Sequence, residues 1–87
     1  AWRRSSDGQS YAMVDAAIAM DHLILAAAEQ GLGTCWIGAF DPEAAREVLG
    51  LPEGIMPVAL TPLGYPADQA RPKLRKPATE LVHRDRW

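Results

Sequence analysis

Residues 31–40, a stretch rich in small residues, hold the backbone positions best suited to binding a ligand. Gly38 and Ala39 end an apolar run, and a backbone with almost no side chain lets a flat ligand approach its N–H groups closely. Trp36 and Ile37 would form an apolar wall beside that ligand. The spacing is not that of a dinucleotide-binding loop, because Trp36 stands where the third glycine of G-x-G-x-x-G belongs. The stretch predicts a site for a planar aromatic ligand. The alternative is that its small residues only mark the boundaries between a strand and the neighbouring helices.

A basic run near the C-terminus, from Pro72 to Pro77, is the second candidate. Lys73 and Arg75 are two residues apart, so in an extended chain they project to the same side and can converge on one anion. Arginine can give a phosphate two parallel hydrogen bonds, and lysine adds a point charge. We expect either a phosphate site or a solvated basic tail.

The remaining side chains offer little chemistry. Cys35 lies in an apolar setting and is expected to be a small buried hydrophobic residue rather than a nucleophile. Asp21 and His22 lack a further ligand at helical spacing, so no metal site is predicted. His83 has no partner suggested by spacing, and no Ser-His-Asp arrangement stands out. No side chain is assigned the role of catalytic acid or base.

The elements that must position these residues alternate between helix and strand. In chain order we expect a loop over residues 1–13, a helix over 14–30, a strand over 34–40, a helix from 41 to 50, a strand over 55–65 and an extended tail over 67–87. Asp15 favours the positive end of the first helix or caps it. Asp41 and Pro42 form a cap and first turn for the second helix, which Gly50 ends. Prolines weaken the second strand and suit an edge, an end or a bulge.

The helix over 14–30 has more apolar surface than so thin a sheet can cover. Val14, Ile18, Leu25 and Ala28 form one stripe, and neighbouring alanines and leucines widen it. Such a helix is usually buried in a core, and part of its surface can instead face another subunit. Two strands and two helices are too few to cover it. We therefore expect its partners to come from a missing part of the chain or from a second subunit, in a dimer or larger assembly.

The composition of the 87 residues is that of an ordinary globular protein, with 48% apolar and 23% charged residues. A formal net charge of −2 argues against a nucleic-acid or membrane-surface protein. One cysteine excludes an internal disulfide, and no apolar run is long enough to span a membrane, so a cytoplasmic location is expected. The chain opens without an initiator Met, which suggests a processed chain or a fragment of a longer protein.

Three blocks of the sequence together resemble the carboxy-terminal half of the FMN-dependent nitroreductase family. They are the run from Asp15 to Glu43, the strand closing on Leu63-Gly64-Tyr65-Pro66, and the Lys73-Leu74-Arg75-Lys76-Pro77 tail. The resemblance extends from about Trp2 to Val82. It implies an α+β fold of two halves, each running helix–strand–helix–strand, of which this chain is the second half with an extended C-terminal tail.

The resemblance also implies a cofactor site. Members of the family are intertwined homodimers with FMN at the subunit interface, and the tail reaches across to the partner. By position, Trp36, Ile37, Gly38 and Ala39 match the segment against the flavin ring, and Lys73 and Arg75 match the pair that holds the FMN phosphate. The segment Arg3–Asp7 is not the family's other phosphate-binding element, because it lacks the later arginine and lies too close to the helix.

The implied activity is transfer of a hydride from NAD(P)H to FMN and then of electrons to a nitroaromatic or quinone. A non-catalytic half-domain that dimerises without cofactor is the alternative. Relatives of this fold also carry out dehalogenation and flavin breakdown, and the residues do not separate these chemistries.

Overall fold

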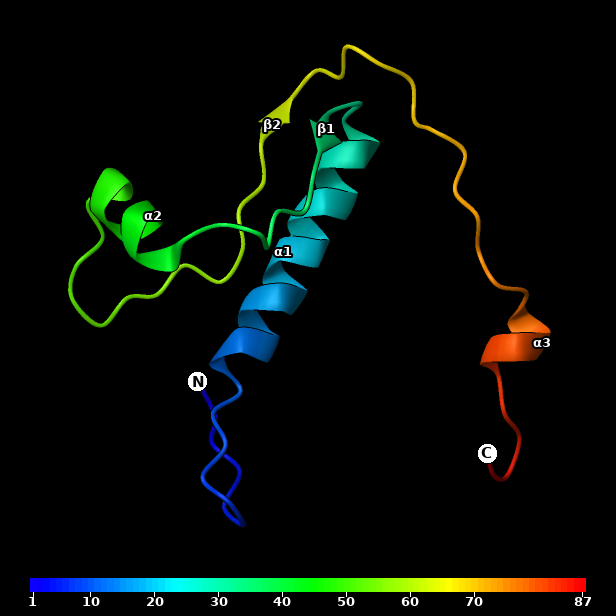
Figure 1. Cartoon of the computed structure of the whole chain (residues 1–87), viewed down its shortest axis with the longest axis horizontal. Coiled ribbons are helices and arrows are strands. Elements are labelled where there is room, and N and C mark those ends of the chain that lie inside the picture. Colours follow the sequence, from blue (N-terminus) through cyan, green and yellow to red (C-terminus); the bar gives the residue numbers. More distant parts are fainter.

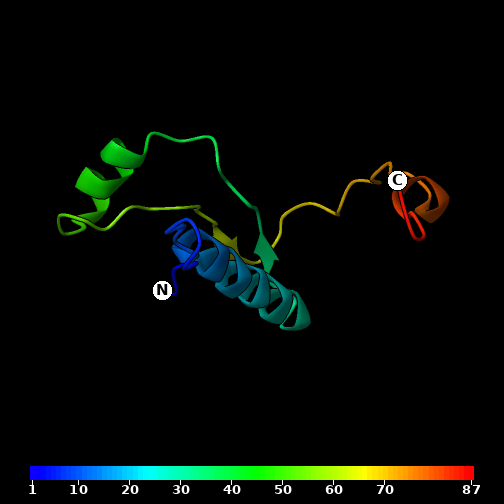
Figure 2. The same cartoon turned by 90° about the horizontal axis from the view of Figure 1, so that it is seen from below.

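The computed structural model describes residues 1–87 as three helices and a small two-stranded sheet (Figure 1). In chain order the elements are α1 (Ala12–Glu29), β1 (Gly33–Thr34), α2 (Pro42–Leu49), β2 (Leu63–Gly64) and α3 (Ala78–Leu81). The expected order of helix, strand, helix, strand and tail is confirmed, and α3 is an addition at the end of the tail. The sheet packs on α1, whereas α2 and α3 stand away from it on opposite sides (Figures 1 and 2).

A turn formed by residues 2–11 leads into α1. The Tyr11 N–H donates to the Trp2 carbonyl at 3.0 Å, and the Arg4 N–H donates to the Gln9 carbonyl at 3.0 Å. The Arg4 guanidinium also holds the Asp7 carboxylate and donates to the Tyr11 hydroxyl at 3.2 Å. This local structure starts α1 at Ala12, two residues earlier than expected.

The N-terminus of α1 has no side-chain cap, so the alternative that Asp15 caps it is wrong. Asp15 lies in the first turn instead, where its charge favours the helix dipole. At the other end Gly31 has a φ of 74°, a left-handed conformation that glycine adopts without steric cost. This glycine turns the chain back, and β1 then runs along the helix (Figure 1).

The helix α2 follows its sequence signals closely. The Asp41 side chain accepts hydrogen bonds from the N–H groups of Glu43 at 2.9 Å and Ala44 at 3.3 Å. Pro42 occupies the first turn, and Gly50 ends the helix in the left-handed region with a φ of 63°. The cap, the proline and the terminal glycine are thus confirmed.

The two expected strands are much shorter than the sequence indicated. Antiparallel pairing places Gly33 opposite Gly64 and Thr34 opposite Leu63, and an isolated bridge joins Ile37 to Leu60 in the same register. The expectations of strands over 34–40 and 55–65 are therefore wrong in extent. A proline cannot donate to a ladder, and each strand has only the other as a neighbour, so regular pairing stops early.

Very little of the chain is buried. Ala27 on α1 is the one buried residue. On the same face of this helix Ala17, Met20 and Ile24 are half-buried against the two strands and the residues next to them. On another face Val14, Ile18 and Leu25 are 47%, 51% and 61% exposed. The expectation of an apolar surplus on this helix is confirmed.

The dimensions of the chain agree with this low burial. Its accessible surface is 7961 Å², whereas a compact monomer of this mass exposes about 5,000 Å². Its radius of gyration is 17.3 Å, against about 12 Å for a compact domain of the same length. The chain is therefore extended and exposes much of its apolar surface.

Candidate functional site

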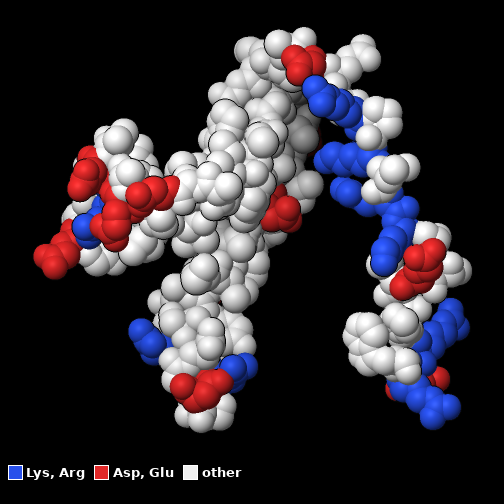
Figure 3. All heavy atoms as spheres, in the orientation of Figure 1, with Lys and Arg blue, Asp and Glu red and all other residues white.

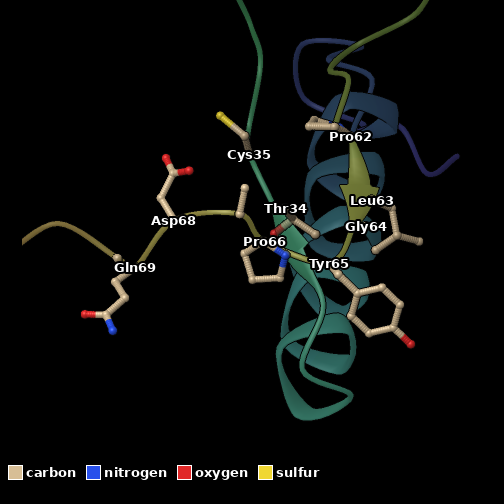
Figure 4. Close-up of a pocket in the computed structure, with 12 residues that line it drawn as sticks. Thr34, Cys35, Pro62, Leu63, Gly64, Tyr65, Pro66, Asp68 and Gln69 are labelled. Atoms are coloured by element: carbon tan, nitrogen blue, oxygen red, sulfur yellow. The ribbon is translucent and has the colours of Figure 1, made fainter.

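The largest hollow of the structure, about 690 Å³, lies beside the sheet (Figure 4). The residues after β2 bend around the end of β1 and form its wall. In the view of Figure 4, Cys35, Asp68 and Gln69 lie on one side of β1, and Leu63 and Tyr65 project on the other side. Backbone of β1 and β2 forms the floor, so the hollow offers main-chain groups as well as side chains.

One wall of this hollow is formed where Pro66 packs closely against Gly33. A Cβ at Gly33 would lie 3.2 Å from the Cβ of Pro66 and 3.5 Å from the Gly64 carbonyl oxygen. Glycine at this position therefore lets the turn after β2 close over β1. That turn sends the tail past the end of the sheet.

Trp36 lies in a separate apolar crevice of about 200 Å³. The crevice is formed between α1 and the segment before β2, and its lining residues are Ala16, Ala17, Met20, Trp36, Met56, Val58 and Ala59. Trp36 is 47% exposed, so a large part of its surface remains open. The next residue, Ile37, is half-buried and exchanges two backbone hydrogen bonds with Leu60, at 2.9 and 3.0 Å.

Gly38 and Ala39 follow this anchor and are both exposed. Neither N–H group donates a hydrogen bond within the chain, although the Gly38 carbonyl accepts one from Phe40 at 3.2 Å. No atom lies within 4 Å of the position that a Cβ at Gly38 would occupy. Two neighbouring main-chain donors on exposed residues are thus left without a partner within the chain, directly after an ordered residue. Such a pair can bind a flat ligand that carries acceptor atoms at its edge.

Lys73 and Arg75 lie on the extended tail, and both are exposed. Basic side chains gather along this tail, whereas acidic ones surround α2 (Figure 3). Six of the nine Lys and Arg residues lie between positions 71 and 86. Neither Lys73 nor Arg75 forms an ion pair, so both are available to an anion.

The structure does not bring the two groups of expected site residues together within one chain. The segment with Gly38 and Ala39 runs toward α2, and the tail with Lys73 and Arg75 runs the opposite way toward α3 (Figures 1 and 2). Both groups can contribute to one ligand only when a second chain or a further part of the protein completes the site.

The environment of Cys35 differs from the expected one. Its side chain is exposed at the rim of the large hollow, so the expectation of a buried hydrophobic residue is wrong. Burial would require a neighbour over this edge of the sheet, and the chain supplies none. No three His, Cys, Asp or Glu side chains are grouped so as to hold a metal ion.

The hollow contains residues that sequence reasoning missed, above all Thr34, Asp68 and Gln69. Polar residues after a strand look like an ordinary loop. The only signal was the Gly64-Tyr65-Pro66 turn, which bends the chain over Gly33.

Comparison with known proteins identifies the class of this fold. The model of the nitroreductase family matches residues 1–65. A nitroreductase family protein of Clostridium difficile 630 superposes with a TM-score of 0.88 and 31% identity, over 99% of this chain and 53% of that protein. The chain belongs to the nitroreductase family, and the expected α+β fold is confirmed.

Two curated relatives carry names with a more specific chemistry. An NADH dehydrogenase of Thermus thermophilus is 39% identical over 77 residues, which are 88% of this chain and 35% of that protein. An FMN reductase (NADPH) of Bacillus subtilis is 32% identical over 77 residues, which are 86% of this chain and 31% of that protein. The chain thus spans about a third of the length of these relatives. No helix of the structure is both long and apolar enough to cross a lipid bilayer.

Proposed function

We propose that the chain is part of an FMN-dependent NAD(P)H oxidoreductase, as the carboxy-terminal half of the catalytic domain. The observation that carries this proposal is the pair of free N–H groups at Gly38 and Ala39, which follow the half-open Trp36. Donors at this place fit the edge of a flavin ring, and the open space at Gly38 leaves room for it. The family membership and the relative named FMN reductase support the same cofactor.

Bound FMN would supply the hydride and electron transfer, because the difficult redox chemistry belongs to the cofactor. The chain's own residues bind and orient it. Trp36 and Ile37 would contribute an apolar wall, and the Gly38 and Ala39 N–H groups would donate to acceptor atoms of the ring. Lys73 and Arg75 neutralise the phosphate. No side chain of this chain is assigned a proton-transfer step, and the proposed electron acceptor is a nitroaromatic or a quinone.

The proposal requires a shared site. Since the ring-binding and phosphate-binding residues leave the sheet in opposite directions, the tail of one protomer would complete the site of another. The exposed stripe of Val14, Ile18 and Leu25 offers the surface for such a homodimer or for the amino-terminal half of the domain. The lone free thiol agrees with a reducing, cytoplasmic location.

Charge reversal in the tail tests the phosphate site. Arg75→Glu should weaken FMN binding roughly tenfold to 100-fold, because hydrogen bonds to charged groups contribute about 1.5–3 kcal/mol. Flavin fluorescence titration of the assembled protein measures the dissociation constant. Arg84→Glu, a reversal on the same tail beyond α3, is the matched control and should leave the constant within a factor of two. Equal constants for wild type and Arg75→Glu would refute the assignment of the tail.

A second function is favoured by the low burial of the chain. With Ala27 as its one buried residue, the chain can be a non-catalytic half-domain that dimerises through α1 without cofactor. The absorption spectrum of the purified protein separates the two functions, because bound oxidised flavin is yellow. A colourless protein that stays colourless after incubation with FMN would favour the half-domain.

A further inference from the structure

An irregularity in the strand ladder, two residues before Ile37, points to a residue that the proposed function does not yet include. Ile37 and Leu60 exchange both of their backbone hydrogen bonds. In an antiparallel pair, such doubly bonded positions recur at every second residue. The same register places Cys35 opposite Pro62, which would be the next doubly bonded pair. Pro62 has no N–H group, so one of those two bonds cannot form.

The second bond of this pair is also replaced. The Cys35 N–H donates to the hydroxyl oxygen of Thr61 at 3.1 Å, rather than to the Pro62 carbonyl. The Thr61 hydroxyl in turn donates to the Pro62 carbonyl at 2.9 Å. Because a carbonyl only accepts and the Cys35 N–H only donates, the direction of this relay is fixed by chemistry. A side-chain hydroxyl is therefore inserted between the two strands at the point where the ladder fails.

The relay has a geometric consequence for the segment that follows. It keeps the backbone at Cys35 and Pro62 separated by a bridging oxygen, while the pairs on either side stay in direct contact. The path of the chain from Cys35 through Ile37 depends on that separation. Ile37 is the last anchored residue before the free N–H groups of Gly38 and Ala39.

We propose that Thr61 is a positioning residue, whose hydroxyl sets the direction of the Gly38 and Ala39 N–H groups. It acts through Cys35 and does not touch the ligand. This inference rests on the proposed function for the identity of the ligand, but the placement of the two N–H groups is independent of it. Without the hydroxyl, the strands must close directly onto the Pro62 carbonyl or leave the Cys35 N–H without a protein partner.

Substitution of Thr61 by valine and by serine separates the hydroxyl from the shape of the side chain. Thr61→Val keeps the branched shape and removes the hydroxyl, whereas Thr61→Ser keeps the hydroxyl. Thr79→Val is the matched control, because Thr79 is an exposed threonine on α3, outside the candidate site, and its hydroxyl makes no hydrogen bond. Two readouts are compared in the purified protein: amide hydrogen exchange with amide chemical shifts by NMR, and FMN titration.

Thr61→Val should speed exchange of the Cys35 amide roughly threefold to tenfold, the range expected for one hydrogen bond. It should also shift the Gly38 and Ala39 amide resonances and weaken FMN binding, and Thr61→Ser should restore all three. If Thr61→Val and Thr79→Val have the same effect on these amides, the inference is wrong. It is also wrong if wild type binds FMN and Thr61→Val binds it equally well. Failure of wild type to bind FMN would contradict the proposed function alone, since the amide readout still tests the placement.

Discussion

At the scale of single residues, close packing requires a glycine at position 33, whereas the space beside Gly38 is empty. A methyl group at Gly33 would meet the rigid ring of Pro66 at 3.2 Å, whereas one at Gly38 would meet nothing. Gly33→Ala should destabilise the protein by about 1 kcal/mol, because overpacking forces the turn after β2 to move. Gly38→Ala should leave stability unchanged and weaken FMN binding. Urea unfolding, followed by tryptophan fluorescence, measures the first effect, and equal midpoints for Gly33→Ala and wild type would contradict it.

The ion pair in the turn before α1 predicts a dependence on pH. The Arg4 side chain, and next the N–H of Gln9, lower the pKa of Asp7 from its ordinary value of 3.8. A lowered pKa means that ionised Asp7 stabilises this turn above about pH 3.8. The contribution disappears as the pH falls through the lower native pKa. An NMR titration of the Asp7 carboxyl should give a midpoint below 3.8 in wild type and a higher one in Arg4→Gln. Identical midpoints would mean that the pair has no effect on the turn.

At the scale of elements, α2 depends on its cap because it packs against little else. Asp41 accepts two backbone hydrogen bonds at the N-terminus of this helix. Asp41→Ala should destabilise α2 by about 1 kcal/mol, whereas Asp41→Asn should retain most of the cap. Hydrogen exchange of the Glu43 and Ala44 amides measures the effect directly. Unchanged protection in Asp41→Ala would show that another group holds the helix start.

The elements that the sequence predicted well are those whose signals are local. Asp41, Pro42 and Gly50 bound α2 within the chain itself, so its ends could be read from residue types. The start of α1 depends on the hydrogen bond from Tyr11 to Trp2, which no helix pattern contains. Strand length depends on neighbours across the ladder, and so the expected strands were too long. The residues of the candidate site were chosen from their types, but the separation of Gly38 from Arg75 is a property of the chain's path.

At the scale of the whole molecule, the exposed stripe on α1 predicts association. The chain exposes far more surface than a compact monomer of its mass, and Ile18 lies in the middle of the stripe. Ile18→Glu should shift the protein toward monomer, because it places a charge in the surface to be buried. Val48→Glu, at a position 86% exposed on α2, is the control and should not change the assembly. Sedimentation velocity distinguishes them, and a stable wild-type monomer would overturn the prediction.

The extended tail also offers exposed peptide bonds that a protease can cut. Trypsin cuts after lysine and arginine but not before proline, so Pro72 and Pro77 protect the bonds after Arg71 and Lys76. The bonds after Lys73 and Arg75 remain open, next to a Leu74 side chain in full contact with solvent. Within residues 71–77, digestion should therefore cut after Lys73 or Arg75 and spare the bonds before Pro72 and Pro77. If the tail binds the cofactor as proposed, added flavin should slow the release of the C-terminal peptide, and an equal rate with and without flavin would contradict that role.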